Sequence, residues 1–209
     1  MSVKIFLSTV SDEFESYREQ LRADLTRPNV DVKDQEYFKA LGGETLEMLD
    51  DYIASCDAVV HLVGDMAGAA PSERGVRAIL EKYPNVGREL PPLGEALANG
   101  GVSYTQWEAS LALYHRKRLI IAKAADKAER EKATFAPTPE SRAAQVAHLK
   151  RLEAVERFPG CEFTTRDGLR KFILASAVLD ARGGRASRTL CRWRDDALQP
   201  RARHSAGDL

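Results

Sequence analysis

The stretch Ala58-Val59-Val60-His61-Leu62-Val63 has the pattern of one buried β-strand. Nearly all of its residues are apolar, and it lies between Cys56-Asp57 and Gly64. A continuous apolar run of strand length, in place of an alternation of apolar and polar residues, is typical of a strand that is covered on both faces. The stretch therefore predicts the central strand of a mostly parallel sheet.

Strand-length apolar runs and helix-period segments alternate on both sides of this stretch, which predicts a doubly wound, mostly parallel sheet of five strands. The other predicted strands are Val3–Ser8, 30–32, 119–122 and 161–164. The first predicted helix opens near Ser11-Asp12 and continues through Leu25 until Pro28 ends it. The other predicted helices are a segment through Leu46 and Ile53, Glu73–Lys82, a short helix opened by residues 103–109, 140–157, and a last helix through Leu169 and Ile173. Helix 140–157 is expected to pack through Val146, Leu149, Leu152 and Val155.

Three segments interrupt this alternation. Residues 64–102 are expected to form a long connection with one helix, Glu73–Lys82, followed by a Pro/Gly-rich stretch at 84–101. The charged and Ala-rich segment 125–133 is expected to be a solvated helix or a flexible excursion. From residue 183 the composition shifts to Arg, Ser and Ala, so we expect a domain at 1–182 and a linker or the start of a further region at 183–209.

Composition narrows the class of protein. The chain of 209 residues is 44% hydrophobic and 30% charged, which is enough to bury one core. Basic and acidic residues both total 31, so no net field favours nucleic acid or an anionic membrane as a partner. The 3 cysteines form no CxxC pair, which indicates a reducing, cytoplasmic compartment without a disulfide framework. No apolar run approaches the roughly 20 residues of a membrane span.

The stretch Ser103-Tyr104-Thr105-Gln106-Trp107-Glu108-Ala109 carries the strongest candidate for chemistry. It opens a short helix that leads into strand 119–122. A doubly wound fold places catalytic groups at such a helix start, at the mouth of the sheet, which makes Glu108 a candidate catalytic carboxylate. Thr105 and Glu108 also fit a capping box, and Trp107 also fits a core position. The residues themselves leave both alternatives open.

For the other candidate residues, a structural explanation is favoured over a functional one. Ser8 fits the plain end of a strand, and Gly42-Gly43 fits a turn. His61 lies in a strand that looks buried, which favours a satisfied core histidine over a base. Gly64-Asp65-Met66-Ala67-Gly68 is a weak candidate for a phosphate cradle because it has neither Rossmann nor Walker spacing. The histidines and cysteines show no metal-ligand spacing, so no metal site is predicted.

Four motifs in this order resemble a TIR-like domain. They are residues 4–14 with Arg18, Gly42-Gly43-Glu44-Thr45-Leu46, residues 56–64, and Ser103-Tyr104-Thr105-Gln106-Trp107-Glu108 followed by Ala112. The chain is similar to a bacterial TIR-related subgroup found at the front of large multidomain NTPase or repeat proteins of immune type. The resemblance implies a flavodoxin-like sheet. In many bacterial members it also implies cleavage of NAD⁺ to nicotinamide and an ADP-ribose product.

The resemblance also implies roles for particular residues. Glu108 takes the position of the catalytic carboxylate. Phe6 and Ser8 would line the substrate pocket, and Trp107 would form a wall or stack on a ring. The loop from Phe38 to Gly43 takes the position of the loop that gates the site and contacts a neighbour. One carboxylate suffices for this reaction because nicotinamide leaves as a neutral molecule, so NAD⁺ is a substrate and no cofactor is expected.

The resemblance finally implies partners. These are NAD⁺, further copies of the chain through TIR-like contacts, and a sensor or NTPase region in the same or a partner protein. The activity would make the domain the effector of a bacterial antiviral defence or signalling protein. Two other classes stay open at this point: a non-catalytic TIR-like self-assembly or adaptor module, and a nucleoside deoxyribosyltransferase-like enzyme, which also uses a Glu at the sheet edge.

Overall fold

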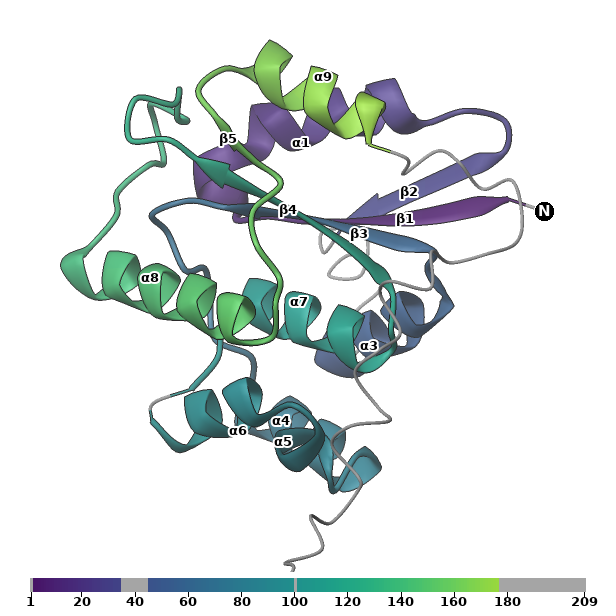
Figure 1. Cartoon of the computed structure of the whole chain (residues 1–209), viewed down its shortest axis with the longest axis vertical. Coiled ribbons are helices and arrows are strands. Elements are labelled where there is room, and N and C mark those ends of the chain that lie inside the picture. Colours follow the sequence, from purple (N-terminus) through teal and green to yellow (C-terminus); the bar gives the residue numbers. More distant parts are fainter. Residues whose placement is uncertain (1, 35–44, 100, 177–209) are drawn as a thin grey trace, which may run out of the picture. The chain divides into compact units, whose positions relative to one another are not determined.

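The strands form one parallel sheet. The computed structural model describes residues 2–34, 45–99 and 101–176, and the sheet order within them is β2-β1-β3-β4-β5 (Figure 1). The strands are β1 (Val3–Ser8), β2 (Val30–Asp34), β3 (Ala58–Val63), β4 (Arg118–Ala124) and β5 (Cys161–Phe163). This order, with helices on both faces, is the flavodoxin-like doubly wound arrangement, so the predicted fold class is confirmed.

Strand β3 is the centre of the sheet, as its sequence predicts. All six of its residues are buried, and it pairs in parallel with β1 on one side and β4 on the other. In this register Val59 lies between Phe6 and Leu119. Both faces of β3 are therefore covered, which explains why its run of apolar residues shows no alternation.

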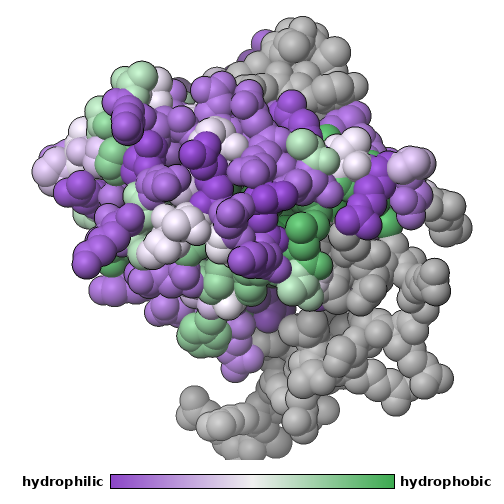
Figure 2. All heavy atoms as spheres, turned by 90° about the horizontal axis from the view of Figure 1, so that it is seen from above, coloured by the Kyte–Doolittle hydropathy of each residue, from purple (hydrophilic) through white to green (hydrophobic). Residues whose placement is uncertain are grey.

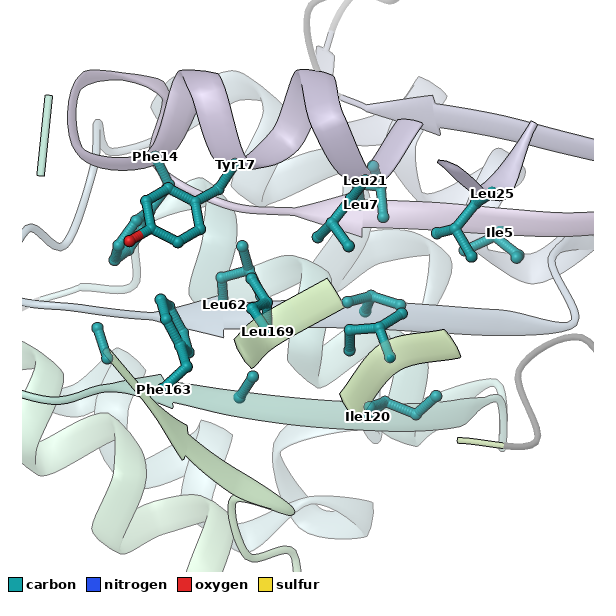
Figure 3. Close-up of a cluster of buried hydrophobic side chains, with 14 of the residues drawn as sticks. Ile5, Leu7, Phe14, Tyr17, Leu21, Leu25, Leu62, Ile120, Phe163 and Leu169 are labelled. Atoms are coloured by element: carbon teal, nitrogen blue, oxygen red, sulfur yellow. The ribbon is translucent and has the colours of Figure 1, made fainter. Parts of the chain in front are cut away.

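One face of the sheet packs against helices α1 (Ser11–Leu25) and α9 (Arg166–Ala175) (Figure 3). Side chains of β1 point to this face at every second residue, since Ile5 and Leu7 belong to this cluster. Aromatic rings close its end near β5: the Tyr17 and Phe163 ring centroids are 5.4 Å apart. The outer surface on this side is mainly hydrophilic, with scattered hydrophobic residues (Figure 2).

The opposite face packs against α3 (Thr45–Ser55), α7 (Tyr104–Tyr114) and α8 (Pro139–Ala154). Helices α4 (Glu73–Lys82), α5 (Val86–Glu89) and α6 (Pro91–Ala98) lie outside this layer (Figure 1). They contribute Ile79, Val86, Leu93 and Ala96 to the apolar cluster that also holds Phe6 and Trp107. Ser8, His61 and His148, which are discussed below, also lie on this side of the sheet.

The expectation of a single helix in segment 64–102 is wrong, because α5 and α6 form within its Pro/Gly-rich part. Proline is tolerated here since Pro91 and Pro92 occupy the first turn of α6, where backbone N–H groups need no helical partner. The glycines allow close contact between the two helices. A Cβ atom on Gly94 would lie 2.6 Å from the Gly87 carbonyl oxygen.

Two further expectations need correction. Segment 125–133 forms turns rather than a helix, and its residues Ala128 and Arg130 are tied into the fold. Helix α8 packs through Leu152 and Leu149 as predicted, but Val146 is 54% exposed, so its predicted place in the core is wrong. The hydrophobic pattern misplaced Val146 because two of the three buried positions of α8, Gln145 and His148, carry polar side chains.

The described residues all belong to the first of the two compact units of the chain, Met1–Leu179. The predicted boundary between residues 182 and 183 lies outside the described residues. None of the helices that the structure describes is both long and apolar enough to cross a membrane.

The packing of α8 gives a direct stability test. We expect Leu152→Ala to lower the free energy of unfolding by about 2–5 kcal/mol, because it leaves a cavity in a packed layer. Val146→Ala, six positions earlier on the same helix but exposed, should change it by less than about 0.5 kcal/mol. Urea denaturation of both variants measures the difference. Equal losses of unfolding free energy in the two variants would contradict the observation that Leu152 is buried and Val146 is exposed.

Candidate active site

The first turns of α7 lie at the edge where the strands of the sheet end. The Tyr104 N–H donates to the Ala69 carbonyl at 2.9 Å, and the Thr105 hydroxyl donates to the Ala67 carbonyl at 3.2 Å. Ala67 and Ala69 belong to the loop that follows β3. These bonds place the start of α7 at the carboxyl edge, where open α/β sheets bind ligands.

Glu108 lies on this part of α7 and is 1% exposed. The alternative in which Thr105 and Glu108 form a capping box is wrong. The N-cap is Ser103, whose N–H donates to Gln106 Oε1 at 3.4 Å, so Gln106 is the acceptor of the box. Glu108 lies two positions beyond Gln106, and capping does not explain the burial of its carboxylate.

Phe6 and Trp107 are both 0% exposed and lie together in the apolar cluster beneath α3 and α7. This position agrees with the core alternative for Trp107, and contact of either ring with a substrate stays a prediction. Two polar atoms in this region lack hydrogen-bond partners in the part of the chain that the structure describes. They are Trp107 Nε1 and Thr9 Oγ1, the latter directly after β1.

Phe38 and Gly43, the predicted gating residues, lie outside the described residues. The elements that flank their segment are described: β2 ends at Asp34, and α3 begins at Thr45. Both of these ends lie at the carboxyl edge, because a helix that follows a parallel strand starts at the edge where the strand ends.

Ser8 is fully buried and belongs to a chain of three side chains. Its Oγ lies 2.8 Å from His61 Nδ1, and His61 Nε2 lies 3.0 Å from His148 Nε2 on α8. The prediction that His61 is a satisfied core histidine is confirmed. Burial lowers the pKa of His61 to about 4 and holds the pKa of His148 well below its usual range, with the neighbouring His61 adding to that shift. Both rings are therefore neutral near pH 7.

Glu13 is a second buried carboxylate at this edge, and its partners are clear. It is 0% exposed and accepts the N–H groups of Asp65 at 2.9 Å and Met66 at 2.8 Å. Arg130 Nε donates to it at 2.6 Å. Burial raises the pKa of Glu13, while the two N–H donors and Arg130 oppose that shift.

This arrangement excludes the phosphate cradle considered for residues 64–68. The N–H groups of Asp65 and Met66 are bound to Glu13, and the next one, of Ala67, is bound to Ser141 Oγ at 2.7 Å. Gly64 must be a glycine for a related reason, because its Cβ would lie 2.1 Å from Glu13 Oε1. The loop after β3 thus binds a side chain in the place where a phosphate would lie.

Within the ranges 2–34, 45–99 and 101–176, the His, Cys, Asp and Glu side chains form no cluster of three or more that could hold a metal ion. The candidate site consists of carboxylates, hydroxyls and neutral histidines. Such groups can stabilise developing positive charge and exchange protons.

Residues 4–171 match the model of a family described as Domain of unknown function (DUF4062). The chain belongs to this family. The matched region begins in β1 and ends within α9, so the DUF4062 domain includes Glu13, Ser8, Glu108 and Arg130. No curated protein matches the chain significantly.

Sequence reasoning missed three residues of the candidate site: Glu13, Arg130 and His148. Glu13 has the pattern of an acidic residue in the first turn of a helix, where it would interact with the helix dipole. Arg130 lies in a charged segment, 117 positions from Glu13. His148 was recognisable only as a polar interruption of the α8 repeat. No local spacing links any of them to a partner.

The pairing of Glu13 with Arg130 predicts that removing the buried arginine lowers stability more than removing an exposed arginine. Arg130→Met should lower the free energy of unfolding by about 3–5 kcal/mol, because it leaves a buried carboxylate without its cation. Arg142→Met removes a side chain that is 57% exposed and lies 3.8 Å from Asp65, and it should cost less than about 1 kcal/mol. Denaturation at pH 7 measures both. A small effect of Arg130→Met would contradict the structural role of the pair.

The two buried histidines predict a loss of stability in mild acid. In the unfolded chain histidine has a pKa of about 6.5, so between about pH 6.5 and pH 4 the unfolded state binds more protons than the folded state. The free energy of unfolding should therefore fall as pH falls through this window. Each histidine contributes a slope of up to about 1.4 kcal/mol per pH unit.

The variant His148→Gln should show a smaller slope than the unmodified chain between pH 6.5 and pH 5, where few carboxylates titrate. Urea denaturation at closely spaced pH values gives the slope for both proteins. If the two slopes were equal, His148 would be protonated in the folded state, contrary to its burial.

Proposed function

We propose that the domain cleaves NAD⁺ to nicotinamide and an ADP-ribose product, with Glu108 as the catalytic carboxylate. The observation that carries this proposal is the burial of Glu108 in the first turns of α7, at the carboxyl edge of the sheet, without a capping role. Buried carboxylates are found disproportionately often at functional sites, which supports a role for Glu108 in the chemistry of this edge.

Two other features of this edge support a bound ligand. Thr9 Oγ1 and Trp107 Nε1 are buried polar atoms without a hydrogen-bond partner in the described part of the chain. They neighbour Ser8 and Glu108 in the sequence. Buried polar groups are usually paired, and an unpaired one near a candidate site is a place where a ligand can complete the bonding.

The chemistry needs little more than one carboxylate. As the bond between nicotinamide and ribose C1′ breaks, its electron pair leaves with the neutral nicotinamide, and positive charge develops on the ribose. The Glu108 carboxylate stabilises that charge. This electrostatic stabilisation is strongest in a site shielded from water. Water then adds its oxygen to C1′ and releases a proton, which gives ADP-ribose. No acid is required for the leaving group, unlike ordinary glycoside hydrolysis.

The proposal also covers the oligomeric state of the domain and its biological role. Residues 35–44 connect β2 to α3 between two ends that lie at the same edge as Glu108. We propose that this segment completes the pocket of the same or a neighbouring copy. We accordingly propose that the domain acts as a cytoplasmic homo-oligomer, triggered by a sensor or NTPase region, as an effector of antiviral defence.

A non-catalytic assembly module is the second candidate. The observation that favours it is the Glu13–Arg130 pair, which fills the crevice between the loops after β1 and β3 with the protein's own side chains. A domain that binds no ligand at this edge would gain stability from such a pair without loss of function.

Nicotinamide release from NAD⁺ distinguishes the two candidates. We expect purified protein to release nicotinamide, with a rate that rises more steeply than linearly with protein concentration if a neighbouring copy completes the pocket. Glu108→Gln should lower the rate by about 100-fold or more, because it keeps the side-chain size and removes the charge. Glu81→Gln, an exposed residue of α4, should leave the rate unchanged.

Thermal melting of both variants separates chemistry from folding. A folded Glu108→Gln protein that still releases nicotinamide at the original rate would exclude Glu108 as the catalytic residue. If the unmodified protein forms oligomers and releases no nicotinamide across the whole concentration range, the assembly module is the correct function.

A further inference from the structure

A hollow lies between α6, α7 and α8. These three helices lie on the side of the sheet opposite α1 (Figure 1). Its volume is about 420 Å³, within the range of small-molecule sites. Its lining includes Glu95, Asn99, Gln106, Ala144, Ala147 and Arg151. Glu108 is not among the residues that line it, so the hollow does not include the proposed catalytic carboxylate.

Arg151 is the main charged group of this hollow. It is half-buried, and within the described residues its guanidinium makes neither a hydrogen bond nor an ion pair. Burial lowers its pKa, and the charge of Glu95 across the hollow opposes that shift. A guanidinium that is partly withdrawn from water and has no hydrogen-bonded acceptor favours a ligand with a carboxylate, which it can bind through two parallel N–H donors.

The hollow continues inward into an apolar recess. This inner part has a volume of about 20 Å³, room for about one methyl-sized group, and it shares Ala96, Gln106 and Arg151 with the outer part. Its walls are mainly apolar, with Leu93 and Leu152 among them. A ligand that fits both parts has an apolar body and one carboxylate.

His148 lines this recess and connects it to the carboxyl edge of the sheet. Its Nε2 lies 3.0 Å from His61 Nε2, and His61 Nδ1 lies 2.8 Å from Ser8 Oγ. The ring nitrogen of His148 that is left for the hollow is Nδ1. Ser8 at the end of β1 and the hollow are thus the two ends of one hydrogen-bonded chain.

We propose that this hollow binds a small organic carboxylate with an apolar body, held by Arg151, and that its binding fixes the direction of the hydrogen bonds from His148 through His61 to Ser8. This inference does not depend on NAD⁺ cleavage.

The chain of bonds has two arrangements, because a neutral imidazole carries one N–H. In the first, His148 carries its proton on Nδ1, His61 Nε2–H donates to His148 Nε2, and the Ser8 hydroxyl donates to His61 Nδ1. In the second, His148 Nε2–H donates to His61 Nε2, and His61 Nδ1–H donates to Ser8 Oγ. A carboxylate in the hollow accepts from His148 Nδ1–H and therefore selects the first arrangement.

The test is a titration with butyrate, whose terminal methyl group fits the recess, using butyramide as the uncharged control of the same shape. We expect saturable binding of the carboxylate and binding at least about tenfold weaker for the amide. Arg151→Met should weaken carboxylate binding by a similar factor. Lys150→Met, which removes the same charge from an exposed position of the same helix, should leave it unchanged. Ala147→Phe fills the hollow, keeps Arg151, and should abolish binding.

Nitrogen-15 NMR of the histidine rings tests the second half of the proposal. In the bound state we expect protons on His148 Nδ1 and His61 Nε2. The opposite arrangement, or binding that leaves the His61 signals unchanged, would overturn the connection to Ser8. Equal binding of the amide, or full binding by a folded Arg151→Met protein, would overturn the site itself.

Discussion

The buried carboxylate of Glu13 holds together the edge on which every candidate function depends. It joins the start of α1 to the loop after β3, 52 positions away, and to Arg130, 117 positions away. Two backbone donors and a guanidinium offset the cost of taking this charge out of water. Gly64 leaves the space for the carboxylate, and a methyl group there would collide with it. The geometry of the crevice between β1 and β3 is therefore set by an internal ion pair.

The two faces of the sheet differ in the kinds of side chain that they bury. Alternation along β1 sends Ile5 and Leu7 toward α1 and α9, into a wholly apolar cluster, while Phe6 and Ser8 face the other way. On that second face the buried groups include Glu108, His61 and His148, and the hollow beside Arg151 lies among its helices. A buried polar group needs a specific hydrogen-bond partner. Single substitutions on this face are therefore expected to have large effects on stability and binding.

The strands and the longer helices were predictable because their apolar residues repeat locally, as in β3 and in α4, which matches its predicted bounds. Helices α5 and α6 were not, since their stability comes from the contact between Gly87 and Gly94 and from packing on α7 rather than from a repeat. The same limit applies to the site. Glu108 could be singled out by its place before a strand, whereas the pairing of Glu13 with Arg130 arises only when distant segments fold together.

The internal pairing of Glu13 places a condition on the proposed reaction. NAD⁺ carries a diphosphate, and in many α/β proteins the backbone of a loop at this edge binds such a group. Here three successive N–H groups, of Asp65, Met66 and Ala67, are already bound to side chains. The binding energy for the diphosphate must then come from other groups. A segment contributed by a neighbouring copy would supply them, which would make catalysis depend on assembly rather than on the isolated domain.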